Sequence, residues 1–378
     1  MGDRQFFETS FGRRIAIDPD FRASHRIVTE TDLSYDYEQQ PASPYEFSKD
    51  LYEFLVFFEF LNRQGMRFNW QRSLDIGGAE STIARLTKAS GLARDVACLD
   101  VRDARAGMSD SHFAQYMEYT RQERDRLRQG APLASLPLLK FFPSFAAEFG
   151  THILNGQGLQ ALTCQPATLD TYYCGDIYNL NRSFDLITAF LCLSHFDLDA
   201  LMAKVSDLLE VGGFFFFFTD YWWWPVNSAE VVGDFPYACQ RLTEADLERY
   251  FAEFRPEERE QAMRRYRYFH HDKAHPTARD YIDAARRAGL EPVASERLMP
   301  KPRSHLRTPF APTFFDLCGE DVLGGVLEDI HQFRPDVELQ DLRTAYVLHA
   351  FHKPARPHDT LKGLVQGYRA TADVQRKE

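Results

Sequence analysis

The segment GGFFFFF at residues 212–218 constrains the fold of this chain more than any other. Successive side chains of a β-strand point to opposite faces of the sheet, so the run from Phe214 to Phe218 puts apolar rings on both faces. Such a strand is stable where helices cover the sheet on each side, as they do in parallel sheets. The segment therefore predicts an α/β protein with a fully buried strand at residues 214–218.

Strand-like and helix-like segments alternate along much of the remaining sequence. Apolar runs predict further strands at residues 72–76, 96–101, 184–193, 292–299 and 345–352. Helical periodicity or helix-ending glycines predict helices at residues 44–63, after Gly77 to Leu86, and at 197–210, 278–288 and about 320–333. This order predicts a largely parallel sheet, in which ligands bind beyond the carboxyl ends of the strands. We expect the loops after Ile76, Val101, Cys174, Phe190 and Tyr221 to line one crevice.

Composition and charge exclude several classes of function. The chain of 378 residues is 44% hydrophobic, enough to bury a large core, and its formal net charge of −11 disfavours binding to a polyphosphate backbone. The six cysteines show no metal-ligand spacing, and several lie in apolar runs, which is typical of a reducing compartment. No apolar segment approaches the roughly 20 residues that span a bilayer. We expect a cytoplasmic protein that binds neither nucleic acid nor membrane.

The sharpest motif is SLDIGGAEST, at residues 73–82. Asp75 ends a strand, and a turn of small residues, Gly77, Gly78 and Ala79, leads directly into a helix. Without large side chains, such a turn lets a ligand approach the backbone closely. It lacks both the full G-x-G-x-x-G pattern of a dinucleotide site and a Walker lysine, so it does not predict a pyrophosphate cradle.

Two further acidic residues follow predicted strands. Asp100 ends the next strand, where a carboxylate can accept hydrogen bonds from both ribose hydroxyls of a nucleoside. Asp176, in the segment CGDI before the strand FDLITAF, can accept a bond from an adenine amino group, with Ile177 beside the base. A cap of a local Asx turn is the alternative role for Asp176.

These motifs, in this order, resemble the class I S-adenosylmethionine-dependent methyltransferases. The resemblance covers about residues 72–101 and 173–353, with gaps, and includes the apolar strand FDLITAFLCLSHF, the segment LLEVGGFFFF and a last strand AYVLHAF. It implies a Rossmann-like, seven-stranded, mostly parallel sheet with helices on both faces, an antiparallel last strand, and helical insertions that form a cap. It also implies S-adenosyl-L-methionine as cofactor, held by Asp75, Gly77, Gly78, Ala79, Asp100, Val101, Asp176, Ile177 and Phe190.

The activity implied is transfer of the cofactor's methyl group to an O, N or C atom of a small molecule, in specialised metabolism. Ala79 and Ser81 stand where the commonest family pattern has glycines. Two alternatives therefore stay open: a non-methylating reaction such as cyclisation with the same cofactor, and a non-catalytic binding protein with a degenerate cofactor motif.

Catalytic and substrate-binding candidates lie in the loops after the strands. His195 follows FDLITAFLCLS and can act as a general base near neutral pH, and Tyr221 is a second catalytic candidate. Three consecutive tryptophans cannot all enter one core, so we expect Trp222 and Trp223 to line an aromatic acceptor pocket. The cluster FHHDKAH adds His270 and His271 as substrate-binding candidates, and we expect no metal site.

The domain organisation follows from these segments. We expect an N-terminal arm, irregular to about residue 40, and a helix that together occupy residues 1–70 and cover the active site. The methyltransferase domain is expected at residues 71–353, with insertions at about 103–169 and 222–276, and a polar tail at 354–378. A second copy of the chain, in a homodimer, is the one macromolecular partner envisaged.

Overall fold

The computed structural model describes most of the chain. Described are residues 5–18, 44–65, 69–104, 107–131, 159, 162–165, 167–220, 231–270, 275–298, 320–344 and 346–355. Among the helices of this part, none is both long and apolar enough to cross a membrane.

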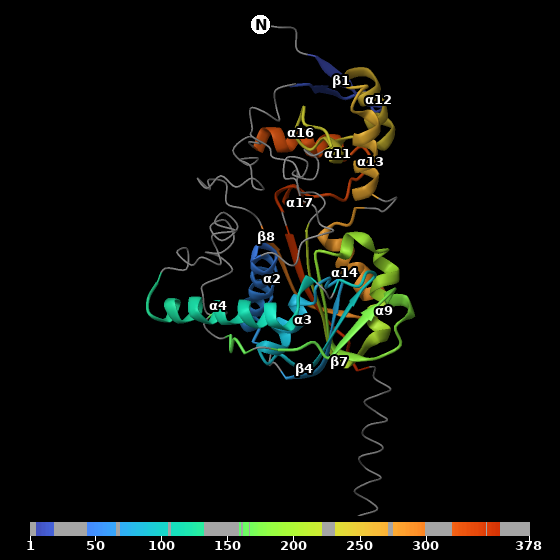
Figure 1. Ribbon diagram of the computed structural model, residues 1–378. Helices are drawn as coiled ribbons and strands as arrows, with labels where there is room; N and C mark the ends of the chain where they lie inside the picture. The colour runs from blue at the N-terminus through green and yellow to red at the C-terminus, as the bar shows by residue number, and fades with distance from the viewer. Residues whose placement is uncertain are drawn as a thin grey trace, which may run out of the picture.

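A seven-stranded sheet forms the centre of the molecule (Figure 1). Its strand order is β5-β4-β3-β6-β7-β9-β8. The strands are β3 (Trp70–Ile76), β4 (Ala93–Asp100), β5 (Thr171–Cys174), β6 (Phe184–Phe190), β7 (Leu209–Asp220), β8 (Glu291–Leu298) and β9 (Tyr346–His352). The pairs from β5 to β7 are parallel, whereas β9 runs antiparallel to both β7 and β8. The predicted Rossmann-like sheet with an antiparallel last strand is confirmed.

The phenylalanine run of β7 is buried from both sides. Phe216 and Phe218 belong to one core cluster, with α2, α3 and α4, and Phe215 and Phe217 belong to another, with α9 and α14. These helices are α2 (Pro44–Arg63), α3 (Thr82–Ala89), α4 (Asp110–Arg128), α9 (Leu198–Leu208) and α14 (Ala278–Arg287). Two layers of helices therefore enclose the sheet, as the alternation of side chains along a strand requires.

Polar side chains fix where several helices begin. Ser109 and Asp197 accept hydrogen bonds from backbone N–H groups in the first turns of α4 and α9. Thr277 and Asp280 form a reciprocal capping box at the start of α14. These bonds satisfy N–H groups that have no partner within the helix. Helices α9 and α14 begin within one residue of the positions predicted from the sequence, 197 and 278.

Residues 5–18 form a hairpin where the sequence predicted an irregular arm, and the rest of that arm lies outside the described residues. Strands β1 (Phe6–Glu8) and β2 (Arg14–Ala16) pair antiparallel, and Phe7 and Ile15 pack against the helices of the second insertion. Those helices are α11 (Ala238–Arg241), α12 (Glu244–Phe254) and α13 (Arg259–His270). Asp246 of α12 accepts hydrogen bonds from both N–H and Oγ of Ser10, each at 2.8 Å. Figure 1 shows this hairpin–helix unit at one end of the molecule, away from the seven-stranded sheet.

Two further helices precede the last strand. They are α16 (Glu320–Ile330) and α17 (Leu339–Arg343). Asp329 of α16 receives ion pairs from Arg13 of the hairpin and from Arg241 of α11, at 2.7 Å each. Leu323, Val326 and Ile330 of α16 belong to the core cluster of α9 and α14. Helix α16 therefore joins the hairpin–helix unit to the main core.

A histidine is buried at the centre of β9. His349 is fully buried among the rings of Phe217, Tyr281 and Phe351, and neither ring nitrogen has a hydrogen-bond partner among the described residues. Burial, together with the positive charge of Arg297, lowers the pKa of His349 to about 3. The folded protein therefore holds this ring neutral, whereas the unfolded chain protonates it below about pH 6.5.

We predict that the substitution His349→Phe reduces the acid sensitivity of the fold. Because the folded pKa is depressed, the unfolded state binds the additional proton between pH 6.5 and 3, and stability falls as the pH falls through that window. From pH 7.5 to pH 5, the wild type should lose about 2 kcal/mol of unfolding free energy relative to the variant. Urea denaturation at both pH values measures this difference, and the comparison at pH 7.5 isolates the packing cost. Parallel pH dependences would contradict the prediction.

Candidate functional site

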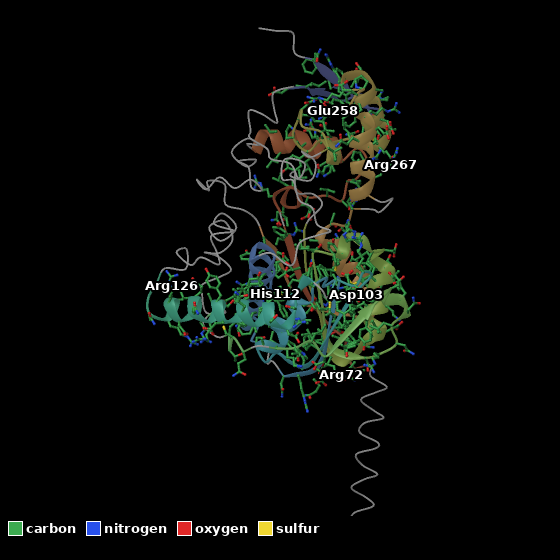
Figure 2. The ribbon with its side chains drawn as sticks, viewed as in Figure 1. Arg72, Asp103, His112, Arg126, Glu258 and Arg267 are labelled. Atoms are coloured by element: carbon green, nitrogen blue, oxygen red, sulfur yellow. The ribbon has the colours of Figure 1, made fainter. Side chains whose placement is uncertain are left out.

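The candidate site lies at the carboxyl edge of the parallel strands. Figure 2 labels Arg72, near the start of β3, and Asp103, just beyond the end of β4, which mark the two opposite edges of the sheet. The loop after β3, residues 77–81, connects directly to α3. This places the motif found in the sequence at the edge where α/β proteins bind ligands.

The loop after β3 has an unusual backbone. Gly77, Ala79 and Ser81 have φ angles of 68°, 37° and 67°, all in the left-handed region. A Cβ atom on Gly77 would lie 2.7 Å from Cβ of Cys192, and one on Gly78 would lie 2.8 Å from Sγ of Cys98. Both glycines are therefore required. Ala79 and Ser81 take up the conformation that suits glycine, at a cost of roughly 1–2 kcal/mol each.

Asp75 is buried beneath this loop. Its Oδ1 atom accepts a hydrogen bond from Thr188 Oγ1 at 2.8 Å, and Oδ2 has no hydrogen-bond partner among the described residues. Burial raises the pKa of Asp75 to about 8, and the nearby acids Asp50, Glu53 and Asp100 raise it further, against the lowering effect of Thr188. The carboxyl group of Asp75 is therefore neutral at pH 7, and one of its oxygens is buried without a described partner in an acidic environment.

Asp100 faces the loop from the end of β4. Its Oδ2 atom accepts a hydrogen bond from the N–H of Ala79 at 3.1 Å, and Oδ1 accepts one from the N–H of Arg102 at 3.0 Å. The next residue, Val101, is 69% exposed, which is unusual for a large apolar side chain beside a buried strand. An exposed apolar surface thus lies directly next to a carboxylate with further acceptor capacity.

Asp176 and Ile177 lie beside Asp100, at the end of the neighbouring strand. The N–H of Gly175 donates to the carbonyl oxygen of Asp100 at 2.9 Å. Asp176 is exposed, caps the short 3₁₀ helix η5 (Ile177–Asn179) and accepts from the N–H of Tyr178 at 3.0 Å, while Ile177 is buried. Asp176 therefore has the capping role considered from the sequence. Its other carboxylate oxygen, Oδ2, accepts from no backbone N–H among the described contacts.

The end of β6 brings Phe190 and His195 to the same edge. Phe190 is almost fully buried, with its ring 6.0 Å from that of Phe57 and 6.5 Å from that of Phe218. Leu191 has a φ angle of 50°, and this strained residue leads into the 3₁₀ helix η6 (Leu193–His195). His195 is exposed, three residues after Cys192, whose side chain contacts the position of Gly77.

Several candidates from the sequence fall outside this description. Tyr221, Trp222, Trp223 and His271 lie outside the described residues, and His270 ends α13 without a described side chain. Their roles stay predictions. Within the described part of the chain, no three His, Cys, Asp or Glu side chains are grouped to hold a metal ion.

Two polar residues that the sequence analysis did not identify support the loop. Tyr172 of β5 donates to the carbonyl oxygen of Ala79 at 2.9 Å. Arg85 of α3 is buried, donates to Ser81 Oγ at 3.1 Å and forms an ion pair with Asp110 at 2.5 Å. A lone arginine on the apolar face of the helix TIARLTKA was a detectable signal for Arg85. For Tyr172, by contrast, the contact spans 93 positions and leaves no local pattern.

The fold of this chain is similar to that of several solved structures. No protein-family model matches the chain, and no protein of curated function matches it. Geranyl diphosphate C-methyltransferase from Streptomyces coelicolor A3(2), solved with Mg²⁺, geranyl diphosphate and S-adenosyl-L-homocysteine, is 15% identical, with a TM-score of 0.38 over 89% of this chain and 90% of that one. An S-adenosylmethionine-dependent methyltransferase from Mesorhizobium loti is 16% identical, with a TM-score of 0.36 over 78% and 97%.

A third solved structure is the plantazolicin methyltransferase BpumL, in complex with a monoazolic desmethylPZN analog and SAH. It is 11% identical, with a TM-score of 0.35 over 82% of this chain and 85% of that one. All three are named as methyltransferases, but their TM-scores and identities are low. The function proposed for this chain therefore rests on its own residues.

We predict that Asp75→Asn changes how the stability of the ligand-free protein depends on pH. Because the folded pKa of Asp75 is raised, its contribution to stability is complete below about pH 4 and is lost as the pH rises through about 8. Between pH 5 and pH 7, the wild type should lose up to about 1.4 kcal/mol per pH unit relative to the variant, whose amide does not titrate. Thermal or urea unfolding across this range measures the difference. A constant gap between the two proteins would show that Asp75 does not titrate there.

Proposed function

We propose that this chain is a methyltransferase that transfers the methyl group of S-adenosyl-L-methionine to an O, N or C atom of a small-molecule acceptor. The observation that carries the proposal is the placement of the Asp100 carboxylate against a loop that begins with two glycines and an alanine, at the carboxyl edge of the sheet. A nucleoside fits that arrangement, because ribose hydroxyls can donate to the carboxylate while the amino acid part of the cofactor lies along the loop.

The surroundings of Asp100 support a purine ligand. Val101 is exposed next to Asp100, and Asp176 is exposed just beyond the adjoining strand. An apolar side chain can pack on the face of an adenine ring, and a carboxylate can accept from its exocyclic amino group. We assign the adenine to the space between these residues, with Ile177 as part of its apolar wall.

The charge of the site supports a cationic ligand over a polyphosphate. The groups that raise the pKa of Asp75 include three acids, Asp50, Glu53 and Asp100. A bound dinucleotide or triphosphate would add negative charge to this environment, whereas the ammonium and sulfonium groups of S-adenosylmethionine would offset it. The Oδ2 atom of Asp75 lies directly under Gly78, so a cation held on the loop would lie close to this carboxyl group.

The conformation of the loop argues against a degenerate cofactor motif. Ala79 and Ser81 replace glycines of the common pattern, yet both keep the left-handed backbone that glycine would adopt. The side-chain hydroxyl of Ser81 accepts from Arg85, and both N–H and C=O of Ala79 are hydrogen-bonded. The chain thus preserves the shape of the loop with other residues, which favours retained binding over lost binding.

The reaction requires little from the protein beyond alignment. When bound, S-adenosylmethionine supplies an activated methyl group on a positively charged sulfur. The protein's task is to hold the acceptor atom about 3 Å from that methyl group and to exclude water, which converts a bimolecular step into a unimolecular one. For an acceptor that must lose a proton, we assign the general base to His195, which follows the strained end of β6. Tyr221, Trp222 and Trp223 remain our proposed acceptor-side residues.

Calorimetric titration with S-adenosylhomocysteine tests the proposal. We expect the wild type to bind and Asp100→Asn to bind about 10- to 100-fold more weakly, because hydrogen bonds to a charged group are worth about 1.5–3 kcal/mol. Asp95→Asn is the matched control, since Asp95 is an exposed residue of the same strand and should leave the affinity unchanged. A wild-type protein that fails to bind at saturating ligand would refute the function.

We further predict that His195→Ala lowers turnover about 10²- to 10⁴-fold for an acceptor that must be deprotonated. The affinity for S-adenosylhomocysteine should stay at the wild-type value, because the change affects proton transfer and not cofactor binding. Turnover is measured with the best acceptor from a panel of amines, phenols and carboxylates. His112→Ala, at an exposed position of α4, serves as the control. Unchanged turnover of the His195 variant would remove it as the base.

A further inference from the structure

The hydroxyl of Tyr172 joins two loops at the candidate site. It lies 2.9 Å from the carbonyl oxygen of Ala79 and 2.9 Å from that of Arg102, and it accepts from the N–H of Ala104 at 3.3 Å. Ala79 belongs to the loop after β3, whereas Arg102 and Ala104 follow β4. One side chain of the edge strand β5 therefore connects the loop after β3 to the loop after β4, the two loops between which the Asp100 carboxylate lies.

Tyr172 and Asp100 together hold Ala79 from both sides. The N–H of Ala79 donates to the Asp100 carboxylate at 3.1 Å, and its carbonyl oxygen shares the single hydroxyl proton of Tyr172 with the carbonyl oxygen of Arg102. These two groups belong to the peptide units before and after the Cα atom of Ala79. Fixing both units fixes the φ and ψ angles of Ala79, and so maintains a left-handed conformation that alanine otherwise avoids.

The other non-glycine residue of the loop is held by different means. Ser81 accepts from Arg85, which also pairs with Asp110 at the start of α4. The restraint on Ala79 therefore depends on β4 and β5, while the restraint on Ser81 depends on α3 and α4. A change at Tyr172 should leave the second restraint in place.

We propose that Tyr172 is a positioning residue for the nucleoside part of the cofactor, which acts by holding Ala79 so that the Asp100 carboxylate stays aimed at the ribose. This inference rests on the proposed function. A glycine at position 79 would adopt the left-handed conformation without help, whereas Ala79 is held in it by Tyr172 of β5. Burial, with the nearby acids Asp100 and Asp103, raises the pKa of Tyr172, so that its hydroxyl remains a neutral hydrogen-bond donor throughout the physiological range.

The test compares two single-atom deletions on neighbouring residues. Tyr172→Phe removes the bridging hydroxyl, and Tyr173→Phe removes a hydroxyl that accepts from Arg182 at 2.9 Å and has no described contact with either loop. We expect the dissociation constant of S-adenosylhomocysteine to rise 5- to 30-fold in the Tyr172 variant and less than 2-fold in the Tyr173 variant. The KM for S-adenosylmethionine should rise in parallel, with kcat and the acceptor's KM within 2-fold of wild type.

A second substitution separates positioning from packing. In the double variant Tyr172→Phe with Ala79→Gly, glycine adopts the left-handed conformation without restraint, so at least half of the lost affinity, on a logarithmic scale, should return. A ring that matters only for packing would show no such rescue, because Ala79→Gly adds no contact. The dissociation constant of the single variant Ala79→Gly, measured in the same way, provides the reference for this rescue.

The outcomes distinguish the two proposals. If the wild type, the Tyr172 variant and the Tyr173 variant all bind S-adenosylhomocysteine with the same affinity, the positioning role is overturned and the methyltransferase assignment stands. If Tyr172→Phe weakens binding without rescue by Ala79→Gly, the positioning role is likewise overturned in favour of packing. If the wild type does not bind, both proposals fail.

Discussion

The two-sided burial of β7 is the constraint on which the rest of the structure depends. Phe215, Phe216, Phe217 and Phe218 are each at most 1% exposed, and they alternate between the two core clusters. Burying one such side chain contributes about 1.5–3 kcal/mol, so the four together reach about 6–12 kcal/mol, which is similar to the net stability of a whole domain. Any arrangement that leaves one face of this strand in water loses half of that contribution. A sheet between two helical layers follows.

The same packing positions the acidic side of the candidate site. Phe216 contacts Phe57 of α2, with ring centroids 4.4 Å apart, and Phe190 contacts both rings from the end of β6. Helix α2 is thereby held against the sheet, with Asp50 and Glu53 close enough to Asp75 to affect its ionisation. Core packing and site electrostatics are linked here because one helix supplies both the apolar rings and the acids.

The sequence was informative where a signal is local. The strands predicted at residues 72–76 and 96–101 end within one residue of the predicted positions, whereas the strand predicted at 184–193 ends three residues earlier, at Phe190. The hairpin of Phe7 and Ile15 was not predicted, because its strands have three residues each and its packing partners lie more than 200 positions away. Tyr172 was missed because its partner Ala79 lies 93 positions away in the sequence. Secondary structure follows from neighbouring residues, whereas a hydrogen bond across the sheet depends on the completed topology.

The acidic environment of the loop also determines the ionisation of Asp75. Four ionised carboxylates, Asp50, Glu53, Asp75 and Asp100, would repel one another in a partly buried pocket, at a cost that falls steeply with any rise in the local dielectric constant. With a pKa of about 8, Asp75 remains protonated at neutral pH and removes one of the four charges, the one with least access to water. A cation bound on the loop above Asp75 would offset this negative charge and favour the ionised form of its carboxyl group. Binding of a cation near Asp75 and release of its proton would then be two aspects of the same equilibrium, so the proposed binding of a cationic ligand is linked to pH.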